Sequence, residues 1–313
     1  MVMTAAPPVT KPETRGDPVA AIANFTRGFS LEATHPSADE VAQLADIAPP
    51  GTRVYISAVP TRPAEEAVVA AVRLRKAGFE PVPHLAVRNF TSAHDLDEFL
   101  ARANGEAQAR CALVIAGDRD NPAGPFRSSI EVIDGGALRR HGFTEIGIAG
   151  YPDGHPRISQ QDLDRALADK VRAADTTGMA VHIVTQFGFD GASMLKWIAR
   201  LRAFGIEHPV RIGLAGPTNL ATLLRYAQRC GVRASAQGLA RQAGLVRQLF
   251  AMSAPDALLR TLAEAHADLG DVAPHFFSFG GLARSARWAQ AVAERRITLE
   301  GEGFRVEPPR QAD

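Results

Sequence analysis

The chain of 313 residues is long enough for one large domain or two ordinary ones, and 46% hydrophobic residues allow a substantial core. A formal net charge of +1 gives no reason to expect a nucleic-acid partner, and no apolar run reaches the length of a membrane span. Cys111 and Cys230 are too few for a disulfide framework or a cysteine-rich metal site. Since residues 1–17 contain no signal-peptide segment, we expect a soluble cytoplasmic protein.

Eight short apolar segments predict strands, because apolar residues follow one another in them with little polar alternation. The sixth, residues 181–184, has the pattern of a strand that is buried on both faces, and Gln186 follows it. In chain order the segments cover residues 29–33, 52–58, 80–87, 111–116, 146–149, 181–184, 210–214 and 275–279.

Helical patterns separate these segments. Ser37, with Glu40 three residues later, predicts a capping box, and Asp190 is placed to cap the helix after the sixth strand. Other helices are expected over residues 63–77, from residue 91 or 92, after Ser159, near residues 218–230, 238–252 and 255–269, and through Trp288.

Strands that alternate with helices are typical of a parallel α/β fold. We predict a (β/α)8 TIM barrel with extra helices before the last strand rather than a doubly wound open sheet. Neither GxGxxG nor GxxxxGK[ST] follows the first strand, as a nucleotide-binding open sheet would require. We expect one catalytic domain over residues 21–300, a flexible tail over residues 1–20 and a C-terminal tail over residues 301–313.

Polar residues stand at the ends of several predicted strands, and in a barrel those ends meet at one mouth. Taken singly, each has a structural explanation, such as a turn cap, a core histidine or a packed amide. Burial of a carboxylate such as Glu32 nevertheless costs free energy, so a functional role is a reason to keep it there. The whole set suits a large polar ligand with one acid for proton transfer, and it comprises Glu32, Ser57, His84, Asp118, Tyr151, His155 and Gln186.

Other chemistries have weaker support. A metal site built from Glu32, His84, Asp118 and His155 would lack HxH or HExxH spacing, so we predict no metal. No strand ends in a lysine suited to a Schiff base, and no GxSxG elbow is present.

Several of these stretches together resemble the methylenetetrahydrofolate reductase family of flavin-dependent barrels, in order and spacing from about residue 28 to residue 297. The matching pieces are Ser30-Leu31-Glu32 with Pro36, Pro83-His84-Leu85, Gly117-Asp118 with Pro122, Tyr151-Pro152-Asp153-Gly154-His155-Pro156, Thr185-Gln186-Phe187-Gly188-Phe189-Asp190, and His275-Phe276.

The resemblance implies FAD at the mouth and hydride transfer between NADH or NADPH, the flavin and a tetrahydrofolate derivative. Glu32 matches the acid that protonates folate N10, and a raised pKa would suit that task. Asp118 matches a catalytic and ligand-binding aspartate near flavin and pterin, and Gln186 matches the amide that holds the pterin. The positions implied to contact FAD are Ser57, His84, Gly117, Asp118, Tyr151, His155, Asp162, Arg165 and Lys170.

This sequence departs from the family at four places. Ala33-Thr34-His35-Pro36 follows Glu32 where two aromatics and a second proline are usual, and Ala116 replaces an arginine. Leu220 stands where an aromatic often stacks on the substrate, and Gly280-Gly281 replaces Asn-Arg. These changes bear on the affinity for FAD, on nicotinamide recognition and on the glutamate tail of folate.

The leading hypothesis is therefore the interconversion of 5,10-methylene- and 5-methyltetrahydrofolate, in either direction. One alternative is a related flavin barrel that oxidises another amine, as proline dehydrogenase does. Another is a folate- or flavin-binding protein without turnover. Small molecules are the expected partners, a homo-oligomer is left open, and neither nucleic acid nor membrane is expected.

Overall fold

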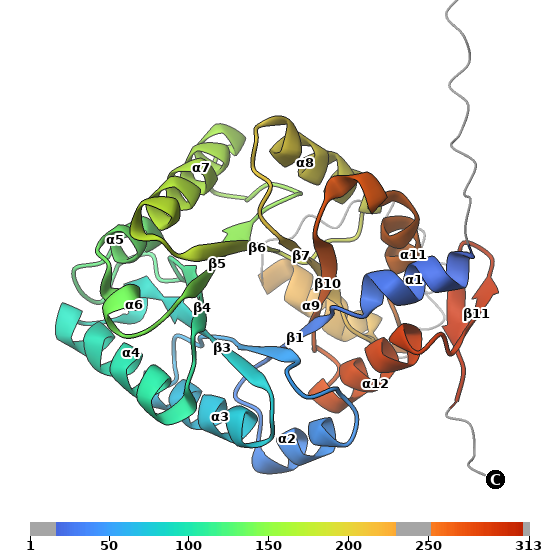
Figure 1. Cartoon of the computed structure of the whole chain (residues 1–313), viewed down its shortest axis with the longest axis horizontal. Helices are drawn as coiled ribbons and strands as arrows, with labels where there is room; N and C mark the ends of the chain where they lie inside the picture. Colours follow the sequence, from blue (N-terminus) through green and yellow to red (C-terminus); the bar gives the residue numbers. More distant parts are fainter. Residues whose placement is uncertain (1–16, 230–251, 309–313) are drawn as a thin grey trace, which may run out of the picture.

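A closed barrel of parallel strands forms the centre of the protein, with helices around its outside (Figure 1). The computed structural model describes residues 17–229 and 252–308. The hydrogen-bonded order around the barrel is β1-β10-β7-β6-β5-β4-β3-β2. Its strands are β1 (Ser30–Ala33), β2 (Arg53–Ile56), β3 (Glu80–Ala86), β4 (Cys111–Ile115), β5 (Glu145–Gly150), β6 (Ala180–Thr185), β7 (Val210–Ala215) and β10 (Val272–Phe277).

Helices connect successive barrel strands, and two short two-stranded sheets lie outside the barrel. The helices are α1 (Pro18–Thr26), α2 (Ala38–Ala45), α3 (Ala64–Lys76), α4 (Ala93–Ala107), α5 (Ser129–Asp134), α6 (Ala137–Arg140), α7 (Gln160–Thr177), α8 (Gly191–Ala203), α9 (Leu220–Arg229), α11 (Asp256–Ala265) and α12 (Leu282–Ala293), with 3-10 turns η1 (Val87–Asn89) and η2 (Ala267–Leu269). One antiparallel sheet pairs β8 (Thr218–Asn219) with β9 (Met252–Ser253), and the other, a hairpin, pairs β11 (Ile297–Glu300) with β12 (Gly303–Val306).

The structure confirms the predicted barrel. All eight predicted strands are present, and α9 and α11 precede the last of them, as expected. The predicted helix near residues 238–252 lies outside the described residues, except for the start of β9 at Met252.

The strand boundaries differ most at the last strand, β10, which begins at Val272 rather than at residue 275. The predicted strand began too late because Pro274 precedes it, and a proline in the sequence argues against a central strand. Regular structure also extends on both sides of residues 21–300, since α1 begins at Pro18 and β12 ends at Val306.

Local sequence signals explain where the helices begin. Ser37 and Glu40 form the predicted capping box of α2, in which each side chain accepts a hydrogen bond from the other residue's backbone N–H. The Asp190 carboxylate accepts hydrogen bonds from the first turn of α8, as predicted. These caps fix the point at which the chain leaves the mouth of the barrel and turns into a helix.

The core has two main layers. The largest apolar cluster lies between the outward faces of the strands and the helices, and includes Leu31, Ile148 and Phe276. A smaller cluster that includes Tyr55 and Val82 fills the barrel interior. No helix within residues 17–229 and 252–308 combines the length and the apolar character that a membrane span requires.

Gly213 in β7 should tolerate no side chain. A Cβ atom there would lie 2.5 Å from the backbone oxygen of Thr185 and 2.8 Å from the nitrogen of Phe187. We expect Gly213→Ala to lower the free energy of unfolding by about 2–3 kcal/mol in urea denaturation, since packed backbone cannot move aside. Gly105→Ala in α4 is the control, because no atom lies within 4 Å of its added Cβ. Equal stability of the two variants would contradict the expectation.

Candidate active site

The acid predicted from the sequence lies at the centre of a polar cluster in the mouth of the barrel. Ser57, one residue beyond β2, donates a hydrogen bond of 2.7 Å to Glu32 Oε1. The Nε2 atoms of His275 and His84 lie 3.3 Å and 3.5 Å from Glu32 Oε2. The Glu32 side chain is 13% exposed, so it is largely buried but reachable from the mouth.

Strand alternation brings these groups together. In β1, Leu31 and Ala33 pack into the outer core, so Ser30 and Glu32 face the barrel interior. Ser30 Oγ lies 2.8 Å from His275 Nδ1, and this contact orients the other imidazole nitrogen towards Glu32. The sequence places His275 at the start of the predicted eighth strand and in a piece that matches the family, but no role was predicted for it.

The pKa of Glu32 differs in direction from the expectation. Burial raises the pKa of this carboxyl, but His84, His275 and Ser57 together outweigh burial and leave it below its usual value. The raised pKa that would suit the acid implied by the resemblance is therefore not found. Burial also lowers the pKa of His84, against the opposing effect of Glu32, and His275 lowers it further. At neutral pH, Glu32 is a carboxylate.

A second group lies after β4 and β5. The rings of Tyr151 and His155 meet edge to face, with centroids 5.4 Å apart. Burial raises the pKa of Tyr151, and the negative charge of the nearby Asp118 raises it further. Gly117, with φ of 90°, makes the sharp turn that presents the exposed Asp118. In the described part of the chain, no hydrogen bond or ion pair joins this group to Glu32.

Gln186 and Leu220 lie on the β6–β7–β10 side of the mouth. Gln186 directly follows β6, and its Oε1 accepts a hydrogen bond from the Phe187 N–H. Because the strands are parallel, Gln186 and Glu32 lie at the same end of the barrel. Leu220, the first residue of α9, is 8% exposed and packs in an aromatic cluster rather than standing free. The aromatic members of that cluster are Phe187, Phe189, Tyr226, Phe277 and Phe279.

The predicted residues on α7 are spread along the helix. Asp162 and Arg165 are exposed and form an ion pair of 3.7 Å. Lys170 is half-buried in the third turn, about 15 Å along the axis from the start of the helix. Burial lowers the pKa of Lys170, and no carboxylate in the described ranges pairs with it. An uncompensated cation of this kind suits an anionic ligand.

The structure shows the surroundings of two residues, His35 and Gly281, at which the sequence departs from the family pattern. His35, with φ of 49°, keeps its side chain 6% exposed and places Nδ1 3.7 Å from the Glu66 carboxylate, so it faces α3 rather than the mouth. Gly281, with φ of 110°, has no atom within 4 Å of the position of a Cβ. Open space therefore stands at the end of the loop after β10.

This arrangement can transfer a proton at the mouth of the barrel. Glu32 is held by one hydroxyl and faces two imidazoles, so a proton can be shared within the cluster. The aromatic rings on the β6–β7–β10 side of the mouth suit a ligand that carries planar rings.

Comparisons with known proteins identify the family of the chain. Residues 37–266 match the sequence profile of a family described as methylenetetrahydrofolate reductase. Methylenetetrahydrofolate reductase 2 of Saccharomyces cerevisiae is 34% identical over 83 residues, which are 26% of this chain and 14% of the relative. The 5,10-methylenetetrahydrofolate reductase of Pectobacterium carotovorum is 28% identical over 160 residues, 50% of this chain and 51% of the relative.

Methylenetetrahydrofolate reductase 1 of Schizosaccharomyces pombe is 29% identical over 159 residues, 48% of this chain and 25% of the relative. The aligned regions thus span about half or less of the length of these relatives. Among solved structures, dihydropteroate synthase of Thermus thermophilus is similar with a TM-score of 0.47 and 15% identity, over 85% of this chain and 92% of that one. Because the family profile covers well over half of the sequence, the chain belongs to the methylenetetrahydrofolate reductase family.

Proposed function

We propose that this protein interconverts 5,10-methylenetetrahydrofolate and 5-methyltetrahydrofolate, with NADH or NADPH as the electron partner. The observation that carries the proposal is the position of Glu32. In a barrel of this family, a carboxylate held by Ser57 and faced by two imidazoles lies at the mouth. Such a group can deliver a proton to folate N10, which opens the five-membered ring of the substrate.

The proton must reach Glu32 after the ligand arrives, because the free carboxyl is ionised at neutral pH. A folate that covers the mouth would remove the remaining water from Glu32 and thereby favour its neutral form. His275 Nε2, 3.3 Å from Glu32 Oε2, is placed to pass a proton to it. In the reverse direction, Glu32 would accept the proton that N10 loses.

Three further residues have proposed roles in binding. The exposed Asp118 would place a negative charge near the pterin, where it favours a cationic folate intermediate. Gln186, at the same end of the barrel as Glu32, would hold the pterin by paired hydrogen bonds. Leu220 is proposed to contact the substrate only at the edge of the aromatic cluster, because it is largely covered.

FAD is the proposed cofactor, and it supplies hydride storage between the two substrates when bound. Lys170, which pairs with no carboxylate in the described ranges, fits an anionic phosphate, and the Tyr151–His155 pair offers aromatic surface at the mouth. Ser57 and His84 already contact Glu32, so they would lie between the acid and the cofactor. Asp162 and Arg165 would contribute only at the exposed start of α7.

Anaerobic absorbance spectroscopy tests the proposal. Purified protein with FAD is mixed separately with NADH, NADPH or 5-methyltetrahydrofolate, and the flavin band near ~450 nm is followed. We expect a nicotinamide and the folate each to bleach the band. Protein that binds no flavin, or flavin that neither partner reduces, would contradict the proposal.

A ligand-binding protein without turnover is the second candidate, and Ala116 and Gly281 favour it because each stands where the family has an arginine. It predicts bound flavin whose absorbance changes with neither donor, so the same experiment separates the two functions. The cytoplasmic location and a homo-oligomer stay predictions.

Lys170 gives a test of flavin binding that needs no turnover. We expect Lys170→Met to weaken FAD binding by about tenfold or more, because a charge-assisted contact to phosphate is lost. Quenching of flavin fluorescence during titration measures the dissociation constant. Lys196→Met on α8 is the control, since Lys196 is exposed. Equal affinity of the two variants would exclude Lys170 from the cofactor site.

A further inference from the structure

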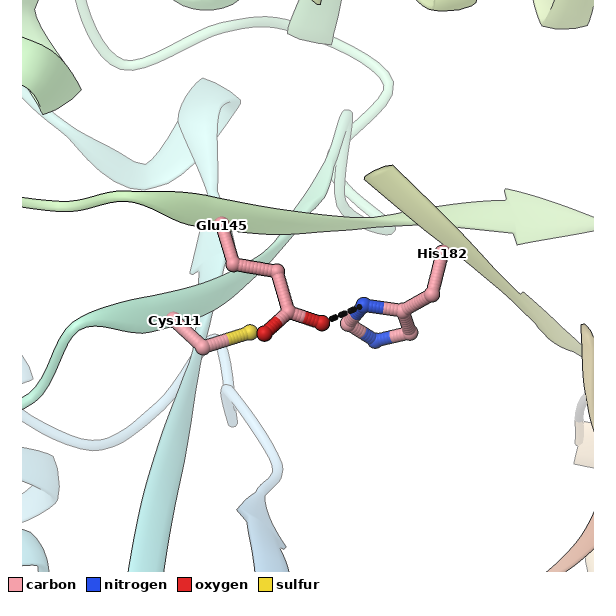
Figure 2. A group of neighbouring side chains, drawn as sticks. All are labelled: Cys111, Glu145 and His182. Atoms are coloured by element: carbon pink, nitrogen blue, oxygen red, sulfur yellow. Dashed lines mark ion pairs between the residues drawn. The ribbon is translucent and has the colours of Figure 1, made fainter. Parts of the chain in front are cut away.

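A row of polar side chains lies in the barrel interior below the acid cluster. The guanidinium of Arg53, at the start of β2, donates hydrogen bonds of 2.6 Å and 2.7 Å to the two oxygens of Glu145 in β5. Glu145 Oε1 also lies 2.8 Å from Nδ1 of His182 in β6, as Figure 2 shows. His182 Nε2 lies 2.6 Å from the hydroxyl of Tyr55 in β2. Tyr55 and His182 are 0% and 1% exposed.

The charges of these groups decide which atom donates and which accepts in each contact. Arg53 and His182 hold the pKa of Glu145 at about 2 against the effect of burial, so Glu145 is a carboxylate. A carboxylate beside Nδ1 favours the tautomer that carries the proton on Nδ1, which leaves Nε2 of His182 to accept from the hydroxyl of Tyr55. Burial raises the pKa of Tyr55, so its hydroxyl keeps its proton and donates it.

Cys111, Glu145 and His182 also lie close enough to suggest a metal site (Figure 2). Two observations argue against it. Arg53 already occupies both oxygens of Glu145, and burial raises the pKa of the Cys111 thiol far above the range in which it would become a metal-binding thiolate. The group is therefore better described as a chain of polar contacts, in which an ion-pair contact joins Glu145 to His182 and a hydrogen bond joins His182 to Tyr55.

Tyr55 connects this chain to the acid cluster. Its ring meets the imidazole of His275 edge to face at a centroid distance of 4.7 Å, and that of His84 at 6.3 Å. These are the two imidazoles that face Glu32. The ring of Tyr55 thus packs against both histidines on the side of the barrel interior.

We propose that Tyr55 is a positioning residue for the acid: its hydroxyl, tethered to His182 and through it to Glu145, fixes the ring that holds His275 and His84 against Glu32. This inference rests on the proposed role of Glu32. A phenylalanine would fill the same volume without burying a hydroxyl, so packing alone does not explain a tyrosine here. Three strands contribute polar groups to the tether. Tyr55 and His182 are fully buried, and a buried polar group is costly unless it is paired.

Arg211 of β7 is a further charged group near this chain, and it pairs with Asp271 at 2.6 Å. Burial, Arg53 and Arg211 lower the pKa of His182, against the opposing effect of Glu145. No hydrogen bond joins Arg211 to Tyr55 within the described residues, so the tether itself runs through Glu145 and His182.

The test follows the histidines in ligand-free protein by nuclear magnetic resonance after labelling with nitrogen-15. The chain has 9 histidines, and His84→Gln and His275→Gln assign the two signals. In Tyr55→Phe and in Glu145→Gln, we expect the titration of His84 to move upward by about half a pH unit or more. The ring at position 55 would be held less firmly, so water could reach the His84 imidazole and reduce the effect of burial on its pKa. The double variant should shift no further than either single one, since both break one tether.

Glu80→Gln is the matched control, because it also breaks a bidentate arginine–glutamate pair at the start of a barrel strand but does not reach Tyr55. Unchanged histidine signals in Tyr55→Phe and Glu145→Gln would overturn the inference, and so would an equal shift in Glu80→Gln. The measurement needs no substrate, so it can fail while the proposed activity stands. If turnover is present, the pH profile of the folate reaction should shift in Tyr55→Phe but not in Glu80→Gln.

Discussion

Replacement of Glu32 by glutamine should abolish nearly all folate turnover and leave flavin binding intact. Glutamine keeps the shape of the side chain and an oxygen that can accept the hydrogen bond from Ser57, so the mouth should keep its structure. It cannot give a proton to N10. Loss of a general acid typically lowers a rate by about 10²–10⁴-fold, and we expect a loss in this range.

Separate half-reactions measured by stopped-flow absorbance make this test specific. Reduction of the flavin by the nicotinamide should be unchanged in Glu32→Gln, whereas reoxidation by 5,10-methylenetetrahydrofolate should be lost, because only the folate step needs the acid. Glu106→Gln is the control, since Glu106 lies on α4 and pairs with Arg102 at the surface. Full folate turnover in Glu32→Gln would remove Glu32 from the acid role and leave the family assignment unaffected.

Much of the fold could be predicted from the sequence because the barrel repeats one simple pattern. Each parallel strand is covered on its outer face by helices, so its residues form an apolar run that ends at a polar turn. The capping residues Ser37 and Asp190 could be identified from local spacing alone. The start of β10 was missed because Pro274 is unusual in a central strand.

The candidate site could be predicted only in part, because its chemistry depends on contacts between distant strands. Glu32, Ser57 and His84 were identified at strand ends, and the structure brings them into contact. His275 lies 243 positions from Glu32 in the chain, and no local pattern pairs the two. The direction of the pKa shift of Glu32 was wrong because burial was weighed without these partners.

The buried polar residues of β2, β5 and β6 show a further limit of sequence reasoning. Glu145 stands just before the predicted fifth strand, and His182 interrupts the sixth as a single polar residue in an apolar run. Either could be a satisfied core residue. Only the register of the closed barrel places His182 beside Tyr55 and Glu145, so the tether could not be predicted from one strand at a time.

The low pKa of Glu32 makes the two directions of the reaction differ in their response to pH. Above its pKa, the protonated fraction of a carboxyl falls about tenfold for each pH unit. Reduction of methylenetetrahydrofolate, which needs protonated Glu32, should therefore accelerate as the pH falls from about 8.5 to about 6, by up to about tenfold per unit where proton transfer limits the rate. Oxidation of methyltetrahydrofolate, which needs the carboxylate, should not accelerate over this range.

His275→Gln separates this explanation from a general effect of pH. The variant removes an imidazole whose hydrogen bond and charge lower the pKa of Glu32, while burial continues to raise it. The pKa of Glu32 should therefore rise, and the acid-dependent limb of the reductive profile should move to higher pH. Carboxylates with lowered pKa values stabilise a fold at neutral pH and lose that effect only as pH falls through those values, so the scan stays above about pH 6. A reductive profile that is flat in the wild type, or that His275→Gln does not move, would mean that the cluster around Glu32 does not control the proton.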